Sequence, residues 1–323
     1  MSEDETCTPA TPVEHPLRWL RVQHETVYDY DAPVELAHHL AYLRPRDTES
    51  QLVRDWSLAI DPAPDEWTLL ATRPESRQAP ASQLSPDPWG NERLVFSHSR
   101  VHERLSVKSV FEAGLSEPPV IDPEASPAWE EVAESLRYHA GAVRSEAVEF
   151  TLASHYARRA PELAAFAAQA FTPGRPLAEA AVALMELIYE EFDYVPQSTH
   201  VGTRAVEALA TKRGVCQDFA HVMIGACRSL GLAARYVSGY LLTQVPEGQA
   251  RLVGADASHA WVAVWCPEQG WLALDPTNRV PAGTDHVTLA WGRDYADVAP
   301  LRGVIRGGGK AQPSVAVTVE PLS

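Results

Sequence analysis

The stretch that most constrains this chain is Gly214-Val215-Cys216-Gln217-Asp218, because a buried helix must begin there. Apolar residues follow it at helical spacing until a glycine, a residue that commonly ends helices; they are Phe219, Val222, Met223, Ala226, Cys227 and Leu230. This pattern places Cys216 in the first helical turn. Unpaired backbone N–H groups and the positive end of the helix dipole favour a thiolate there. Cys216 is therefore a candidate nucleophile, and the alternative is a small apolar cysteine at a helix start.

A histidine and a carboxylate are predicted to lie side by side further along the chain. Residues 258–275 predict a β-hairpin, because two runs rich in β-branched and aromatic side chains flank a Pro-Glu-Gln-Gly turn. If Trp265 pairs with Trp271, His259 and Asp275 share one face of the hairpin as diagonal neighbours. A register slipped by two residues makes them direct partners. Either arrangement orients an imidazole as the general base that a thiol nucleophile requires.

Four motifs follow one another in this segment: GVCQDFAH at 214–221, ARYVSGY at 234–240, SHAW at 258–261 and WLALDPTN at 271–278. Together they resemble the transglutaminase-like superfamily of papain-fold cysteine enzymes, and within it a bacterial branch described as cysteine proteases. The resemblance implies that Cys216 is the nucleophile, that His259 is the base and acid, and that Asp275 orients the histidine.

Stabilisation of an oxyanion is also implied by the resemblance. One donor is the backbone N–H of Cys216, which points outward at the helix start. The candidate side chains for a second donor or for substrate binding are Tyr194, Gln197 and Gln217. Eukaryotic members of the superfamily use a tryptophan, and this chain has none between Trp129 and Trp261; we choose Tyr194 as the second donor.

Composition and charge exclude several classes of function. The chain has 323 residues, 45% of them hydrophobic and 22% charged, which fits an ordinary globular protein of two domains. Its net charge of −16, with no compensating basic block, argues against a nucleic-acid or membrane partner. The first residues lack the pattern of a signal peptide, so we expect a cytoplasmic protein that acts on a peptide or protein substrate.

No cofactor or metal site is expected. The four cysteines are widely separated, which argues against a disulfide framework or a zinc knuckle. His38 and His39 are neighbours on a predicted strand, so they point to opposite faces and cannot bind one ion together.

Three regions are predicted from composition and periodicity. Residues 1–16 form a disordered leader, residues 17–116 an N-terminal antiparallel β domain, and residues 123–323 a catalytic domain with C-terminal β-strands. The motif HETVYDY at 24–30 resembles an N-terminal region that accompanies many bacterial transglutaminase-like proteins, and it carries no recognisable chemistry. The expected fold class is α+β: a papain-like (transglutaminase core) domain preceded by an antiparallel β-sandwich-like domain.

The expected function is acyl transfer through a thioester on Cys216. Hydrolysis of an amide or peptide bond is our first interpretation, because nothing in the sequence marks a binding tunnel for an amine. The alternatives are a protein-glutamine transglutaminase, in which an amine resolves the thioester, and a peptide-binding scaffold without activity.

Overall fold

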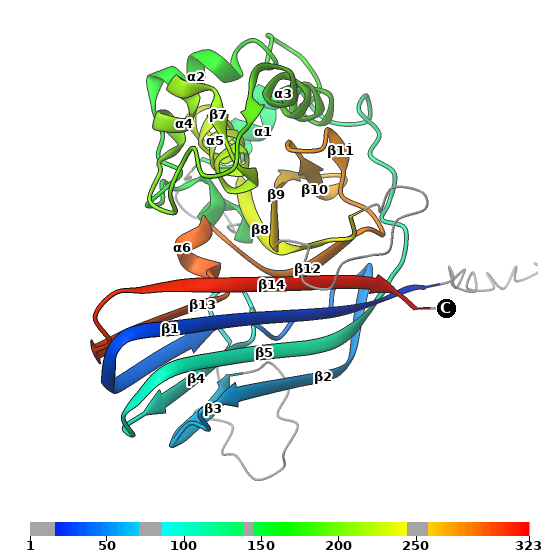
Figure 1. The fold of residues 1–323 in the computed structure, drawn as a ribbon. Helices are drawn as coiled ribbons and strands as arrows, with labels where there is room; N and C mark the ends of the chain where they lie inside the picture. The colour runs from blue at the N-terminus through cyan, green and yellow to red at the C-terminus, as the bar shows by residue number, and fades with distance from the viewer. Residues whose placement is uncertain (1–16, 71–85, 138–144, 244–257, 323) are drawn as a thin grey trace, which may run out of the picture.

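Two layers of sheet and one layer of helices make up the protein. The computed structural model describes residues 17–70, 86–137, 145–243 and 258–322, so the expected leader (1–16) lies outside the described residues. A long curved antiparallel sheet forms the lower part, and a second sheet carries the helices on its opposite face (Figure 1). This agrees with the α+β class expected from the sequence.

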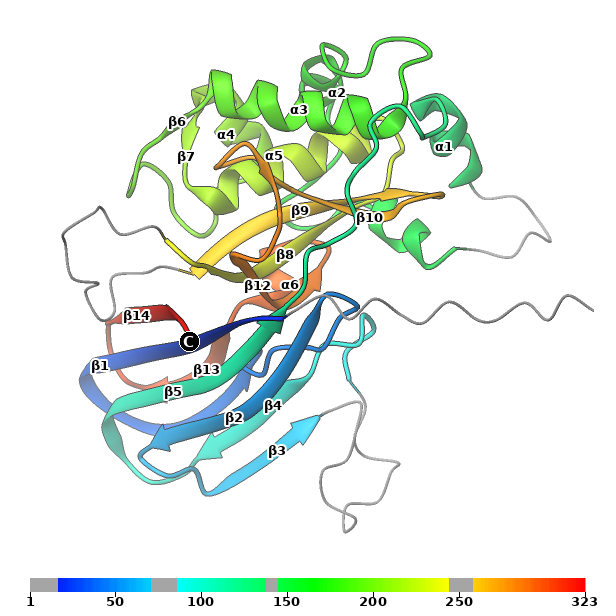
Figure 2. The same ribbon diagram turned by 90° about the vertical axis from the view of Figure 1, so that its right-hand side faces the viewer.

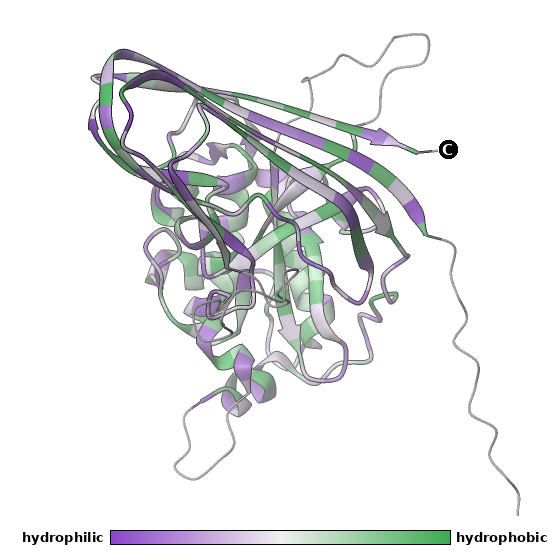
Figure 3. Ribbon diagram, turned by 90° about the horizontal axis from the view of Figure 1, so that it is seen from below, coloured by the Kyte–Doolittle hydropathy of each residue, from purple (hydrophilic) through white to green (hydrophobic). Residues whose placement is uncertain are grey.

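The lower sheet is built around the longest strand, β1. Within the described residues it contains β1 (Arg18–Ala41), β2 (Gln51–Asp61), β3 (Glu66–Leu70), β4 (Arg93–His98), β5 (His102–Leu115), β13 (Leu301–Gly307) and β14 (Ala311–Pro321). Five of these follow the order β2-β5-β1-β4-β3, and β13 and β14 pair with β1. Hydrophobic and hydrophilic residues alternate along these strands, as expected for a sheet with one packed face (Figure 3).

β1 runs as one strand of 24 residues although it contains a proline. The strand passes through Pro33, and its pairing with β5 shifts between Asp29 and Val34. Proline is tolerated in a strand at such an irregularity, where the ladder has lost its regular hydrogen bonds.

The C-terminal strands lie in the lower sheet, whereas the expected division placed residues 123–323 together in the catalytic domain. β14 pairs along β1 in an antiparallel register that sets Val319 opposite Val22 and Val315 opposite Thr26. Val317 and Val319 are fully buried, in one cluster with Leu20 and Val22 of β1. The apolar alternation of β14 thus continues the packed face of β1. The N-terminal β region is therefore one curled sheet that includes the end of the chain.

The upper part holds the second sheet, with strand order β11-β10-β9-β8-β12, and a short parallel pair. Its strands are β6 (Asp193–Tyr194), β7 (Arg213–Gly214), β8 (Ala234–Leu241), β9 (Ser258–Cys266), β10 (Gly270–Asp275), β11 (Val280–Pro281) and β12 (His286–Gly292). The helices are α1 (Trp129–Ser135), η1 (a 3-10 helix, Glu146–Thr151), α2 (Pro161–Ala167), α3 (Leu177–Glu191), α4 (Ala205–Thr211), α5 (Cys216–Ser229) and α6 (Tyr295–Val298). In the described part of the chain, no helix is both long and apolar enough to cross a membrane.

The second sheet is packed on both faces, with α2 to α5 above it and the lower sheet below it (Figure 2). Side chains of α5, including Phe219 and Val222, share the main core with Val262 of β9. On the other face, Tyr240 and Val287 pack in the cluster that contains Leu20 and Val22 of β1. The two parts are therefore joined by an apolar interface.

Candidate active site

Cys216 is the first residue of α5, as the sequence predicted, and the turn before it is shaped by Gly214 and Asp218. The Asp218 carboxylate accepts hydrogen bonds from the Val215 N–H at 2.9 Å and the Thr199 hydroxyl at 2.6 Å, so it caps the helix. A Cβ atom at position 214 would lie 2.7 Å from the Asp218 Cβ, which leaves room only for glycine. This tight turn fixes where the sulfur lies.

The first turn of α5 provides free hydrogen-bond donors. The backbone N–H groups of Cys216 and Gln217 have no preceding helical turn whose carbonyls could accept from them. Together with the helix dipole they form a site of positive potential next to the sulfur, which is partly exposed. This is the environment that suits a negatively charged oxygen or sulfur.

The hairpin of β9 and β10 has the register predicted from the sequence, with Trp271 opposite Trp265. His259 near the start of β9 and Asp275 at the end of β10 therefore lie on one face. The His259 Nε2 atom is 2.7 Å from the Asp275 Oδ2 atom. Because Asp275 takes Nε2, the Nδ1 atom remains for Cys216, whose side chain hydrogen-bonds the imidazole. The three residues thus meet in space.

Asp275 is fully buried and accepts a dense set of hydrogen bonds. Its Oδ2 atom accepts from His259, from Asn278 Nδ2 at 2.7 Å and from His286 Nε2 at 3.1 Å. Its Oδ1 atom accepts from the backbone N–H groups of Thr277 at 2.9 Å and Asn278 at 3.3 Å. Burial disfavours the carboxylate, but the hydrogen bonds from His259 and His286 outweigh it and lower the pKa of Asp275. The group is therefore a buried anion.

His286 is a member of this cluster that the sequence did not reveal. Its Nδ1 atom accepts a hydrogen bond from the Gly283 N–H at 3.3 Å, so the proton of the neutral ring lies on Nε2 and is donated to Asp275. The edge of the ring also packs against Trp261, with ring centroids 5.3 Å apart. His286 thus donates to the same carboxylate oxygen as His259.

Among the described residues, His259, Asp275 and His286 are the group whose ligand atoms lie close enough to hold a metal ion, all within 4.8 Å of one another. In this structure the same ligand atoms form hydrogen bonds with one another. Both imidazole Nε2 atoms point at the same carboxylate oxygen. A cation there would have to displace both protons.

The His259 imidazole carries a positive charge at neutral pH. Burial favours the neutral ring, but hydrogen bonds with Asp275 and Cys216 outweigh it and raise the pKa of His259 to about 10. An imidazolium next to a sulfur at a helix N-terminus stabilises a thiolate.

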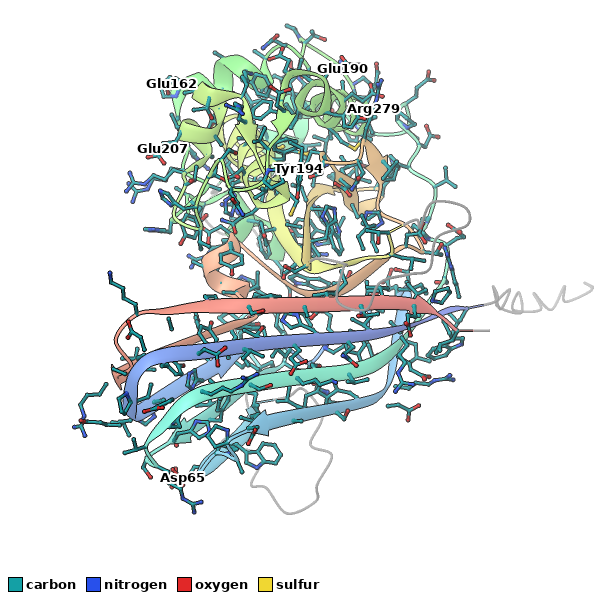
Figure 4. All side chains as sticks on the ribbon, in the orientation of Figure 1. Asp65, Glu162, Glu190, Tyr194, Glu207 and Arg279 are labelled. Carbon is teal, nitrogen blue, oxygen red and sulfur yellow. The ribbon has the colours of Figure 1, made fainter. Side chains whose placement is uncertain are left out.

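A pocket of about 360 Å³ opens over Cys216 and His259. Tyr194 and Gln217, two of the three candidate donors, line it, and Gln197 does not. The Gln217 amide donates to the Val201 carbonyl at 3.1 Å, so this side chain is already engaged. Figure 4 labels Tyr194 near the centre of the upper part in that view. Tyr194 therefore keeps a position next to the sulfur, and the candidate Gln197 lies apart from it.

Tyr236 on β8 is another pocket residue that the sequence analysis did not select as a donor. It is 3% exposed. Burial, followed by the nearby Cys216, raises the pKa of Tyr236, so the hydroxyl keeps its proton. The signal available in the sequence was the ARYVSGY motif, which forms β8 and has this tyrosine as its third residue.

Known proteins with similar sequences agree with this architecture. Residues 164–276 match the family described as the transglutaminase-like superfamily, and residues 20–113 match the bacterial transglutaminase-like N-terminal region. An uncharacterised protein of Mycobacterium tuberculosis (strain H37Rv) is 39% identical over 292 residues, covering 88% of this chain and 87% of its own. A protein-glutamine gamma-glutamyltransferase of Pseudomonas aeruginosa is 35% identical over 135 residues, which cover 39% of this chain and 20% of that protein.

The fold also matches a solved structure. A "Putative Cysteine Protease" from Cytophaga hutchinsonii superposes with a TM-score of 0.71 over 95% of this chain and 91% of its own, at 21% identity. The likeness extends through both sheets, because it covers nearly the whole of each chain. Sequence and fold thus lead to the same conclusion: the chain belongs to the transglutaminase-like superfamily, and it carries the bacterial transglutaminase-like N-terminal region ahead of the core.

Proposed function

We propose that the protein is a cysteine hydrolase that cleaves amide or peptide bonds through a thioester on Cys216, with His259 as acid and base and Asp275 as its orienting partner. The observation that supports this most is one pocket in which a helix-terminal sulfur meets an imidazole held by a buried carboxylate. Superfamily membership adds to it, because the superfamily is enzymatic.

The proposed reaction has two steps. The Cys216 sulfur attacks the carbonyl carbon, and the oxyanion accepts hydrogen bonds from the first N–H groups of α5. The C–N bond breaks as His259 gives its proton to the leaving amine. Water then attacks the thioester while His259 removes a proton from it, and the carboxylic acid leaves as the thiolate is regenerated. Tyr194 is our candidate for a further donor to the oxyanion, from its place in the pocket wall.

Transamidation is the second candidate, and one observation favours it. The gamma-glutamyltransferase of Pseudomonas aeruginosa is similar to this chain over 135 residues. In that reaction a primary amine, in place of water, attacks the same thioester.

Products distinguish the two reactions. The protein is incubated with a peptide library, with and without an added primary amine, and the products are identified by mass. Cleaved or deamidated peptides support hydrolysis, and amine adducts support transamidation. Cys216→Ala must abolish both while the circular dichroism spectrum and melting temperature stay unchanged. Turnover that persists in this variant contradicts the proposal.

A peptide-binding scaffold without activity is tested by alkylation. Iodoacetamide at neutral pH should modify Cys216 and spare Cys227, because Cys227 is fully buried and burial raises its pKa to about 12. Equal labelling of the two would favour the scaffold.

A further inference from the structure

The lower sheet forms part of the pocket above Cys216. His24, Thr26 and Tyr28 of β1 line it, together with Pro313 and Val315 of β14. These residues belong to the N-terminal region and to the end of the chain, on the opposite side of the pocket from α5. The motif HETVYDY, which carried no recognisable chemistry in the sequence, therefore lines the same pocket as Cys216.

The period of the strands explains why these residues face the pocket. On β1, every second side chain from Leu20 points toward the second sheet, and Leu20 and Val22 are buried in the apolar interface. The same face continues through positions 24, 26 and 28 into the pocket. β14 follows the same rule, since Val317 is fully buried whereas Val315 is 50% exposed. This face of β14 therefore belongs to the apolar interface at Val317 and to the pocket wall at Val315.

His24 ties this wall to the strand pair that carries the catalytic imidazole. Its Nδ1 atom lies 2.9 Å from the Tyr240 hydroxyl on β8, and its Nε2 atom lies 2.8 Å from the Thr26 hydroxyl. Tyr240 is paired with Ser258, the residue before His259. The wall is therefore held in a fixed position relative to His259.

Among the described residues, the wall of the pocket opposite α5 carries no charged side chain. None of the described residues that line it is a lysine, arginine, aspartate or glutamate, although the chain as a whole carries a net charge of −16. Hydroxyl and aromatic groups line it instead. Burial lowers the pKa of His24 to about 4, so this ring is neutral at neutral pH. A charged group that entered would lose water without gaining an opposite charge on this wall.

We propose that Thr26, Tyr28 and Val315 form the second wall of the substrate-binding site, and that this wall selects substrates whose groups next to the reacting carbonyl are uncharged. The assignment of a substrate rests on the proposed function. The test measures alkylation of the Cys216 thiol and needs no amide turnover. A wrong assignment of the wall can therefore be distinguished from a wrong assignment of the reaction.

The experiment measures alkylation of Cys216 by three chloroacetamides of similar size. Their amide nitrogens carry a carbamoylmethyl (neutral), a carboxymethyl (acidic) or an aminoethyl (basic) group, and each rate is divided by its rate with glutathione. The variants are Val315→Lys and Val315→Asp, which place opposite charges on the wall at a half-exposed position. The matched control is Ser314→Lys, because Ser314 is exposed and lies on the opposite face of the same strand.

The neutral probe should react fastest with the wild-type protein. Val315→Lys should raise the ratio of acidic to neutral probe about three- to fivefold, and Val315→Asp should lower it by a similar factor, as expected for a charge several ångströms from the probe. Ser314→Lys should leave the ratio unchanged.

Two results overturn the proposal. Val315 variants that behave like Ser314→Lys would mean that the wall lies outside the binding site. A wild-type preference for either charged probe would mean that the site does not select uncharged groups. Labelling of Cys216→Ala gives the background, which is subtracted from every rate.

Discussion

The carboxylate partner of His259 in the candidate site is a buried anion, Asp275. Its two oxygens accept five hydrogen bonds, from two imidazoles, one amide and two backbone N–H groups. Hydrogen bonds of this kind stabilise a carboxylate more than its protonated form, so they keep the negative charge in place. The consequence is a histidine with a fixed orientation and a raised pKa.

His286 is predicted to influence chemistry that it does not touch. In His286→Leu the carboxylate loses one donor, so the depressed pKa of Asp275 rises and Asp275 holds the His259 imidazole less firmly; labelling of Cys216 should slow along the acid limb of its pH profile. His286→Gln keeps an N–H donor and should slow labelling less. The measurement is the rate of iodoacetamide labelling against pH. Identical profiles for the leucine variant and the wild type would assign His286 a packing role alone.

The sequence predicted this cluster only where the residues are close along the chain. His259 and Asp275 lie on one hairpin, so a local register determines their contact. His286 begins β12, which pairs with β8, and its place depends on that distant pairing and on an irregularity near Thr288. No local pattern encodes such a contact.

The position of the Cys216 sulfur depends on where helix α5 begins, because Cys216 is its first residue. The capping carboxylate of Asp218 sits against the backbone of Gly214 and holds the N–H of Val215. At the other end Arg228 is fully buried and donates to the carbonyls of Phe150 and Ala234, each at 2.8 Å. The helix is therefore held at both ends.

Gly214→Ala is predicted to disturb both stability and reactivity. The new methyl group would lie 2.7 Å from the Asp218 Cβ, so the turn must shift, at a cost of about 1–3 kcal/mol in the free energy of unfolding. Labelling of Cys216 should slow because the sulfur moves with the turn. Urea unfolding and iodoacetamide kinetics measure the two effects. Gly283→Ala is the control, since a Cβ there meets nothing within 4 Å.

The sequence indicates that helices exist more reliably than it indicates where they begin and end. Apolar periodicity and a proline at the start, Pro161 or Pro176, indicate helices in the sequence where the structure shows α2 and α3. Ser126 and Pro127 would suit the cap and first position of a helix, but α1 begins later, at Trp129, and its N-cap residue Ala128 forms an isolated bridge with Pro176. The 3-10 helix η1 was missed, since six residues with one small apolar face give little periodic signal.

Across the whole molecule, three histidines are buried in places where they cannot be charged easily. Burial lowers the pKa of His24 and His39 to about 4 and that of His221 to about 3. His39 also lies near His98 and His102, which oppose a further positive charge. These rings take up protons more readily in the unfolded chain, where the pKa of histidine is about 6.5.

The free energy of unfolding should therefore fall as the pH drops from about 6.5 toward 4. The sign follows from linkage: in this range the unfolded state binds more protons, so the stability present above 6.5 is lost as the folded pKa values are approached. Urea unfolding at several pH values measures the slope. His39→Leu should make the slope shallower. A slope that is unchanged in this variant would contradict the assignment for His39.

The sequence alone could not predict that β14 belongs to the lower sheet. The alternation of residues 314–319 predicted a strand, but its partner β1 lies at the other end of the chain. Apolar alternation states that one face will be buried and leaves open which strand lies next to it. The predicted domain boundary near residue 123 follows the order of the chain. The lower sheet instead combines strands from both ends of the chain.

The pairing of β1 with β14 has a consequence for synthesis on the ribosome. Translation adds about 5–20 residues per second, so β1 is made some tens of seconds before its last partner exists. During that interval the edge of β1 that receives β13 and β14 has open N–H and C=O groups. The nascent protein should thus depend on chaperones late in elongation, and its thiol should meet a finished pocket only after β14 has left the ribosomal tunnel.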